Sequence, residues 1–246
     1  MIEIFAGTTI GKRHQQQDCF VVDNIVPEIM PDEFFGYYEK YDAGPVLVGV
    51  FDGLGGEEGG NIASCHAANL LYTEFYKCYD EKKETDFYDH LVSATDKIHK
   101  TITEEFYSAG LRGGTTLTAA VIFEDKLYFI NVGDSPAFRC QRKTDNIEEI
   151  SVRHNCGYDR NMLQHCIGTC DPTEQISEVA NVITLPFEKG DAIVLCSDGI
   201  TNTISEGKLL RAAYSRDILK KGRKLVKKAG EAEKADNSTI VIVRKS

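Results

Sequence analysis

The chain has 246 residues and a formal net charge of −10, with 42% hydrophobic and 27% charged residues. This composition is typical of globular proteins, and the length allows one large domain or two small ones. The acidic balance argues against a nucleic-acid-binding surface, because phosphate backbones require a basic footprint.

The N-terminal segment MIEIFAGTT alternates apolar and polar residues and has no basic region in front of an apolar core. It therefore predicts a strand and not a signal peptide. No apolar run approaches the length of a membrane-spanning helix. We expect a cytoplasmic protein without membrane association, in which the eight cysteines are reduced thiols.

Short apolar or alternating runs predict strands along most of the chain. Most of them follow one another through short turns, which favours antiparallel sheets. The predicted strands cover residues 2–6, 19–22, 46–51, 116–123, 126–132, 137–141, 182–185, 192–197 and 239–244. Between the second and third of them, residues 24–45 hold three prolines and many aromatic residues. This segment is either a ligand-facing loop or an extended hairpin insertion, and its sequence leaves both open.

Apolar residues at helical spacing predict two long helices, over residues 59–79 and 86–106. A third helical region covers residues 206–229, divides near Ser215 and ends in the basic run KKGRKLVKK. That run is either a patch for an anion or a partner, or an ordinary solvated helix face.

Five aspartates lie next to predicted strands. Asp52 ends an apolar run in VFDGLGG, where the glycines allow positive φ and the close approach of a backbone or a ligand. Asp134 in FINVGDSPAF and Asp198 in IVLCSDGIT also follow apolar runs, whereas Asp18 and Asp236 precede strands. We expect a sheet to present the three carboxylates that end or follow apolar runs, those of Asp52, Asp134 and Asp198, side by side on one rim.

Carboxylates that cluster within a few ångström cannot all ionise without compensation. Mg²⁺ and Mn²⁺ prefer oxygen ligands of this kind, and the absence of His and Cys from the five motifs disfavours zinc and iron. The Cys- and His-rich segment RHNCGYDRNMLQHCIGTC, residues 153–170, fits no common zinc spacing. Structural zinc there is the less favoured hypothesis.

Six motifs then carry a resemblance to a known family: GKRHQQQD, VGVFDGLGG, GGTTLTAAVI, INVGDSPAF, LCSDGIT and DNSTIVIV. In this order they resemble the metal-dependent protein phosphatases of the protein phosphatase 2C type, in particular the bacterial branch. The match extends from about Gly7 to Val243. It implies an α+β fold, a four-layer αββα sandwich of two antiparallel sheets flanked by helices. Residues 1–246 would form a single catalytic domain, with an insertion at about 24–45 and a shortened flap at about 150–161.

The resemblance also implies a reaction, the hydrolysis of phosphoserine and phosphothreonine on proteins by a water that bridges two Mg²⁺ or Mn²⁺ ions. Asp52 would bridge the two ions, the carbonyl of Gly53 would bind one of them, and Asp198 and Asp236 would hold the first ion from the other side. Asp134 matches the position that, with Asp198, holds a third ion in bacterial members.

The remaining matched positions have supporting roles in the family. Asp18 would act on the metals indirectly or through a water, and Arg13 would clamp the substrate phosphate. Gln17 stands where many relatives have Glu, which removes a charge near the second ion. Leu54 stands where many eukaryotic members have a His that is thought to protonate the leaving group.

Two alternatives remain. The first is a catalytically silent phosphatase-like module that binds phosphoproteins and regulates a partner. The second is another two-metal hydrolase such as a nuclease, which the acidic charge of the chain disfavours. For the phosphatase, the expected partners are phosphorylated proteins and an opposing serine/threonine kinase in a signalling pathway.

Overall fold

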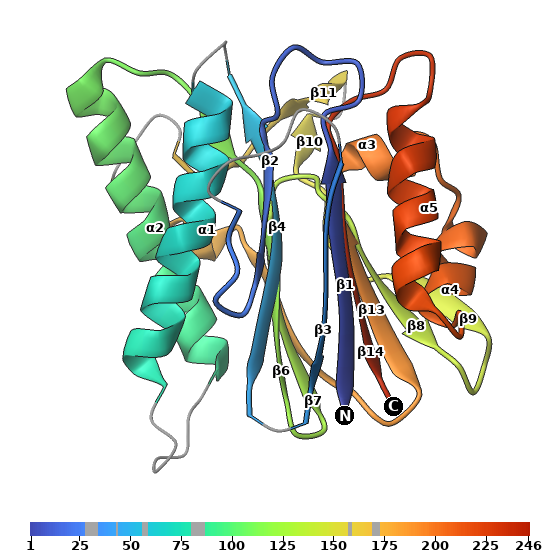
Figure 1. Ribbon diagram of the computed structural model, residues 1–246. Coiled ribbons are helices and arrows are strands. Elements are labelled where there is room, and N and C mark those ends of the chain that lie inside the picture. The colour runs from blue at the N-terminus through green and yellow to red at the C-terminus, as the bar shows by residue number, and fades with distance from the viewer. Residues whose placement is uncertain (28–33, 43, 56–58, 80–86, 157–158, 169–172) are drawn as a thin grey trace.

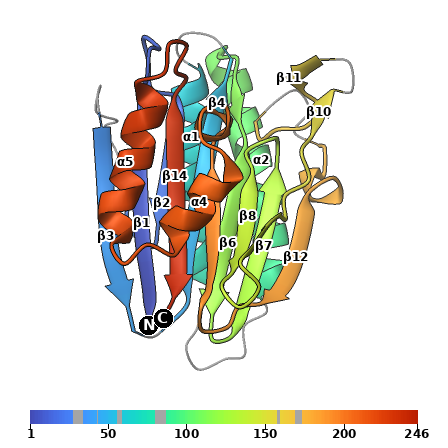
Figure 2. The same ribbon diagram turned by 90° about the vertical axis from the view of Figure 1, so that its right-hand side faces the viewer.

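The computed structural model describes residues 1–246 apart from 28–33, 43, 56–58, 80–86, 157–158 and 169–172. In this described part, two antiparallel β-sheets lie face to face (Figures 1 and 2). The first sheet has the order β3 (Phe34–Tyr41), β1 (Ile2–Thr9), β14 (Ser238–Lys245), β13 (Asp191–Cys196), β8 (Ala137–Gln141) and β9 (Asn146–Glu149). The second has the order β12 (Asn181–Pro186), β7 (Lys126–Val132), β6 (Leu117–Phe123), β4 (Val46–Leu54) and β2 (Asp18–Val22), and β5 (Gly114–Thr115) pairs with β4.

Helices cover the outer face of each sheet. On the second sheet lie α1 (Gly59–Cys78) and α2 (Phe87–Ala109), and on the first sheet lie α3 (Asp198–Thr201), α4 (Glu206–Ala213) and α5 (Ile218–Gly230) (Figure 1). The 3₁₀-helix η1 (Ile176–Glu178) packs against α2. The predicted αββα sandwich is therefore confirmed.

Strand β4 shows why the sequences of several strands are continuous runs of apolar residues. Val48 and Val50 face the first sheet and belong to the core between the two sheets, whereas Leu47 and Phe51 belong to the core beneath α1 and α2. A strand that is buried on both faces needs apolar residues at every position. On the other side of the molecule, Phe5 of β1 packs in the core beneath α4 and α5.

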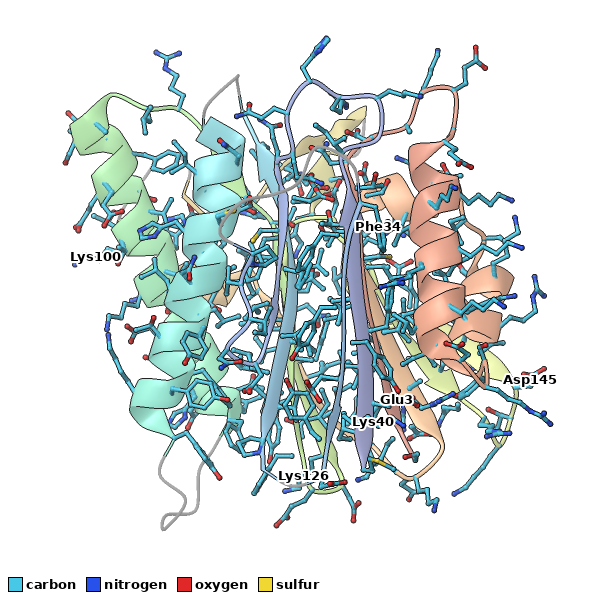
Figure 3. The ribbon with its side chains drawn as sticks, in the orientation of Figure 1. Glu3, Phe34, Lys40, Lys100, Lys126 and Asp145 are labelled. Carbon is cyan, nitrogen blue, oxygen red and sulfur yellow. The ribbon has the colours of Figure 1, made fainter. Side chains whose placement is uncertain are left out.

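The first and the last strand of the fold are neighbours. β1 and β14 pair over eight residues, from Ile2 opposite Lys245 to Thr9 opposite Ser238. Glu3 of β1 lies across from Lys40 of β3, at 3.8 Å between Oε1 and Nζ, and also forms an ion pair with Arg244 of β14 (Figure 3). The end of β1 and the start of β14 both lie at the end of the sandwich away from the N and C labels (Figure 1).

Most predicted elements are present, and the 206–229 region divides around Ser215 into α4 and α5 as expected. The main omission is β3, which the sequence analysis left inside the 24–45 segment. Residues 34–41 pair with β1 along its whole length and form an edge strand of the first sheet. In the flap segment, β10 (Asn155–Cys156) and β11 (Asp159–Leu163) form a small separate sheet. No described helix has both the length and the apolar character needed to cross a membrane.

Candidate active site

The five predicted aspartates lie at one end of the sandwich. Asp52 is near the end of β4, Asp18 begins β2 directly opposite Asp52, and Asp134 follows β7. Asp198 begins α3 just after β13, and Asp236 precedes β14. The expectation that one sheet presents Asp52, Asp134 and Asp198 on one rim is wrong, because the first two belong to strands of the second sheet and Asp198 follows a strand of the first. They approach one another because the two sheets end at the same end of the sandwich.

A cavity of about 620 Å³ opens between these ends. Seven of the eight predicted site residues line it: Arg13, Gln17, Asp52, Gly53, Asp134, Asp198 and Asp236. The eighth, Asp18, is 1% exposed and lies behind the cavity wall, where one carboxylate oxygen accepts a hydrogen bond of 2.7 Å from the Ser197 hydroxyl. The other, Oδ1, has no hydrogen-bond partner.

The carboxylates destabilise one another's charged forms. Burial, followed by the negative charges of Asp18, Asp198, Asp134 and Asp236, raises the pKa of Asp52 well above its ordinary value. Burial and the charges of Asp134 and Asp236 likewise raise the pKa of Asp198. Burial also raises the pKa of Asp18 to about 7. A group of carboxyls in this situation takes up either protons or cations.

Arg13 supplies positive charge at the edge of this cavity. Its Nη2 atom donates to Oδ2 of Asp236 at 2.6 Å, and its side chain is 62% exposed. From the resemblance, the arginine is expected to bind the substrate phosphate and the aspartate a metal. The structure brings the two side chains together, a contact that the motif spacing did not predict.

Polar side chains absent from the predicted set form hydrogen bonds to the side chain of Asp134 and the backbone of Asp52. Asn155 of β10 donates to Oδ2 of Asp134 at 2.8 Å. Thr116 accepts a hydrogen bond of 2.9 Å from the backbone N–H of Asp52, and its hydroxyl lies 2.7 Å from that of Ser135. Asn155 could not be identified from the sequence, because its contact depends on the fold of the flap segment.

Asn237 is a second residue that the sequence analysis missed, although it stands next to Asp236 in a quoted motif. It is 6% exposed, its Oδ1 accepts from the backbone N–H of Gln17 at 2.9 Å, and its Nδ2 donates to the carbonyls of Ile10 and Gln15. This one side chain therefore fastens both ends of the loop that carries Arg13.

The glycines after Asp52 are required by backbone packing. A Cβ atom on Gly53 would lie 2.2 Å from the carbonyl oxygen of Gly60 and 2.6 Å from that of Gln17. A Cβ atom on Gly59 would lie 1.9 Å from the carbonyl oxygen of Arg112. The close approach of another backbone, one of the uses of glycine expected from the sequence, is seen at Gly53 and Gly59, and Gly55 has φ +93°. This close approach seats the start of α1 against the end of β4.

The donor set of the cavity fits a hard divalent cation. Its charged ligands are carboxylates, and behind the cavity wall the buried Oδ1 of Asp18 is a further carboxylate oxygen without a hydrogen-bond partner. As placed, however, no group of three or more described His, Cys, Asp and Glu side chains is close enough together to hold a metal ion. Asp236 faces Arg13 and Asp134 faces Asn155, so binding an ion requires these carboxylates to turn toward one another.

Two imidazoles bear on the zinc hypothesis for residues 153–170. Nδ1 of His154 accepts a hydrogen bond of 3.1 Å from the backbone N–H of Gly133, and its ring packs edge-on against His165. Both imidazoles therefore have packing roles in the described part of the segment. The side chains of Cys156 and Cys170 lie outside the described residues.

The protein has a two-sheet sandwich with flanking helices and an acidic cavity at one end of both sheets. These features are those of α+β enzymes that resemble protein phosphatases. The family model described as "Protein phosphatase 2C" matches residues 25–234. The chain belongs to the protein phosphatase 2C family. The matched range includes Asp52, Gly53, Asp134 and Asp198, whereas Arg13, Gln17, Asp18 and Asp236 lie outside it.

Individual relatives agree with this assignment. The chain is 26% identical over 231 residues to the serine/threonine phosphatase stp of Listeria innocua, covering 86% of this chain and 88% of that protein. Its fold matches the Streptococcus agalactiae serine/threonine phosphatase with a TM-score of 0.79 at 22% identity, covering all of both chains. It also matches the catalytic domain of the phosphatase PstP, solved with two manganese ions, with a TM-score of 0.73 at 18% identity over 99% of each chain. The predicted family and the prediction of a protein phosphatase enzyme are confirmed.

Proposed function

We propose that this protein hydrolyses phosphoserine and phosphothreonine monoesters on proteins, using two or three Mg²⁺ or Mn²⁺ ions. The ligands would be the side chains of Asp52, Asp134, Asp198 and Asp236 and the carbonyl of Gly53, with Asp18 and Gln17 acting indirectly. The observation that carries the proposal is the cavity that these carboxylates share. The manganese-containing PstP structure and the names of the curated relatives support it.

The electrostatics of the cavity support bound cations. The pKa values of Asp52 and Asp198 are raised because their charges have little compensation, so cations would lower the free energy of the ionised cluster. Bound divalent ions would supply the positive charge and the acidified water that hydrolysis of a phosphate monoester needs. The catalytic carboxylates in this proposal are Asp52, Asp198 and Asp236.

Arg13 binds the substrate phosphate in this proposal. Its planar guanidinium can donate two parallel hydrogen bonds to phosphoryl oxygens. It would exchange Asp236 for the phosphate, and its exposed position leaves room for that rotation. Leu54 lines the same cavity and has no proton to give, so protonation of the leaving alkoxide falls to water and not to this side chain.

The test is the release of phosphate from a phosphothreonine peptide with Mn²⁺, with EDTA, and with the Asp52→Asn variant. We expect metal-dependent turnover that EDTA abolishes and that the Asp52→Asn substitution lowers by about a hundredfold or more, the order seen when a key charge-stabilising group is removed. If calorimetry shows intact metal binding but no turnover occurs, the silent phosphoprotein-binding module replaces the enzyme.

The setting and the substrates of the enzyme belong to the same proposal. The enzyme would act in the cytoplasm and oppose a serine/threonine kinase by removing phosphate from the kinase's substrates. Residues 1–246 would form one catalytic domain, with specificity set by the 24–45 and 150–161 segments. Exchange of either segment with that of a relative, assayed on a panel of phosphopeptides, tests this assignment. Unchanged preferences would contradict it.

A further inference from the structure

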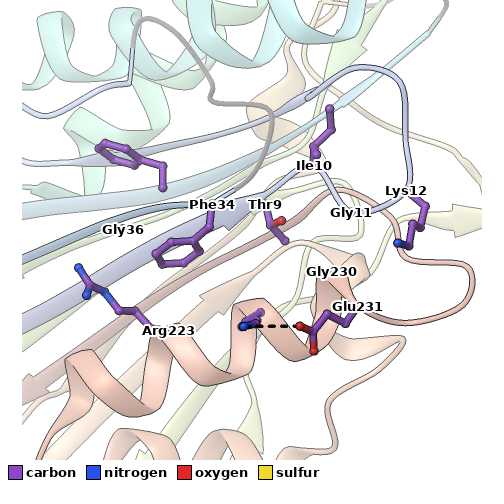
Figure 4. Close-up of a pocket in the computed structure, with 11 residues that line it drawn as sticks. Thr9, Ile10, Gly11, Lys12, Phe34, Gly36, Arg223, Gly230 and Glu231 are labelled. Atoms are coloured by element: carbon purple, nitrogen blue, oxygen red, sulfur yellow. Dashed lines mark ion pairs between the residues drawn. The ribbon is translucent and has the colours of Figure 1, made fainter.

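A second cavity, larger than the first at about 920 Å³, lies between α5 and the strands β1 and β3 (Figure 4). We call it the α5 groove. Its lining includes the side chains of Lys12, Phe34, Arg223 and Lys227. Nothing in the proposed catalytic mechanism uses them.

The α5 groove is basic in a protein that is acidic overall. Helix α5 carries six Lys and Arg residues and no Asp or Glu, in a chain of net charge −10. Arg223 and Lys227 stand one helical turn apart and both face the groove, with Lys12 at its end. Glu231 is the one acidic residue of the described lining, and its 3.7 Å contact with Lys227 is solvent-exposed (Figure 4). An exposed pair of this kind contributes little and a ligand can displace it.

The groove also exposes an aromatic surface. Phe34 at the start of β3 is 36% exposed, and the guanidinium of Arg223 lies 6.0 Å from its ring centroid. The neighbouring Gly36 has no side chain, and a Cβ atom there would lie 2.7 Å from the Phe34 ring. Most large apolar side chains of the described chain are buried, so an open ring flanked by cations is suited to an apolar side chain with acidic neighbours.

The groove and the active-site cavity share a wall. Gly11 and Lys12 line the groove, and the next residue, Arg13, lines the cavity. The backbone N–H of Lys12 donates to the carbonyl of Ala235 at 3.0 Å, immediately before Asp236. Gly11 has φ +66°, and a Cβ atom there would lie 2.3 Å from the Asp236 carbonyl oxygen. A peptide whose phosphate reaches Arg13 can therefore continue over this wall into the groove.

We propose that the α5 groove is a docking site for an acidic segment of the phosphoprotein substrate, an Asp- or Glu-rich stretch with one large apolar side chain. This inference rests on the proposed phosphatase function. The apolar side chain packs on Phe34 while the carboxylates pair with Arg223, Lys227 and Lys12. A peptide fits the observations better than an anionic membrane, because the cations and the ring line a concavity and a bilayer surface cannot enter one.

The test compares two phosphothreonine peptides that differ only in one flank, Asp-Glu-Phe-Glu against Ser-Gln-Ala-Gln. Both are assayed with Mn²⁺ on the wild type, on Arg223→Glu/Lys227→Glu, and on Lys224→Glu/Lys228→Glu. The last variant is a matched control, with the same charge change and spacing on exposed positions of α5 outside the groove. A labelled acidic peptide without phosphate, followed by fluorescence anisotropy, reports docking apart from turnover.

We expect the wild type and the control variant to hydrolyse the acidic-flank peptide with a KM about tenfold lower than the neutral one, as two or three exposed ion pairs allow. The groove variant should lose this preference and the anisotropy signal but retain its activity on p-nitrophenyl phosphate. Phe34→Ala should lower the preference without changing the charge.

Three results would overturn the inference and are distinct from a failure of the proposed function. Equal KM values for both peptides on the wild type contradict the docking site, and so does an equal loss in the groove and control variants. Binding to phosphatidylserine vesicles that only the groove variant loses, without a peptide preference, assigns the surface to a membrane. If the proposed function itself is wrong, the wild type will show no metal-dependent turnover of either phosphopeptide or of p-nitrophenyl phosphate.

Discussion

The active-site cavity and the α5 groove are neighbouring concavities that collect like charges in opposite ways. The cavity gathers carboxylates from the ends of both sheets, and their desolvation and repulsion raise the pKa values of Asp52 and Asp198. The groove gathers cations along one face of a helix, where Arg223 and Lys227 are exposed to solvent. Water and salt screen the second set much more strongly than the first. The same number of like charges would therefore lower the free energy of unfolding in the cavity and change it very little in the groove.

Among changes that alter the contrast between the acidic cavity and the basic groove, Asp52→Asn should have the largest effect. It removes one of the repelling charges, so we expect the metal-free protein to gain about 1 kcal/mol, or about 2–4 °C in Tm, while hydrolysis is lost. Thermal unfolding in EDTA measures the gain, with the exposed Asp42→Asn as a control that should leave Tm unchanged. A lower Tm for the Asp52→Asn variant would show that the cavity does not hold uncompensated charge.

Asn237→Ala should affect both concavities, because Asn237 fastens the loop that forms their shared wall. The variant leaves buried carbonyl and N–H groups unsatisfied, at about 1–3 kcal/mol for each such group. We expect a Tm lower by several degrees, together with weaker binding of acidic peptide and slower hydrolysis. Asn69→Ala, which removes an exposed side-chain hydrogen bond on α1, is the control. If the Tm falls but acidic-peptide binding and hydrolysis are unchanged, the loop does not contribute to either site.

Arg13→Lys should act on the cavity alone. It retains the charge but loses the two-pronged contact to phosphate, so we expect KM for phosphopeptides to rise about tenfold with a smaller change in kcat. Because the Arg13–Asp236 pair is largely exposed, the free energy of unfolding should change by less than about 1 kcal/mol. Steady-state kinetics on both peptides measure the first effect. A selective loss of the acidic-flank preference would instead place Arg13 in the groove.

The stability of the metal-free fold should also depend on pH. The pKa of Asp18 is raised to about 7 in the folded state, above an unfolded value of about 4. Its neutral form stabilises the fold below about pH 4, and this contribution is lost as the pH rises through 7. We expect the Tm in EDTA to fall by a few degrees between pH 5 and 8, and Asp18→Asn to flatten the slope. An equal slope in both proteins would assign the effect to other groups.

The sequence predicted those parts of the fold in which the pattern is local. The apolar positions Leu71 and Ile98 recur at helical spacing in α1 and α2, and both side chains are fully buried beneath these helices. Strand β3 escaped prediction because it is an edge strand with half-buried aromatic residues such as Tyr38 and exposed charged residues such as Lys40. Its identity as a strand comes from pairing with β1, about thirty residues earlier, and not from its own alternation.

The residues of the candidate site were predictable as a set, and their contacts were not. Asp52, Asp134 and Asp198 stand out because each ends or follows an apolar strand, and all three line one cavity. The contacts of Arg13 with Asp236 and of Asn155 with Asp134 join residues far apart in the chain. Such contacts depend on how the two sheets and the flap pack, and no local spacing encodes that packing.

The pairing of β1 with β14 has a consequence for how the chain folds during synthesis. Residues 2–9 are synthesised more than two hundred residues before their eight-residue partner in β14, so the centre of the first sheet cannot close until that later segment has left the ribosome. The second sheet has its strands and covering helices available earlier, from residues 18 to 186. Until β14 is added, β1 presents an open apolar edge, and the nascent protein is most exposed to aggregation and to chaperone binding during that interval.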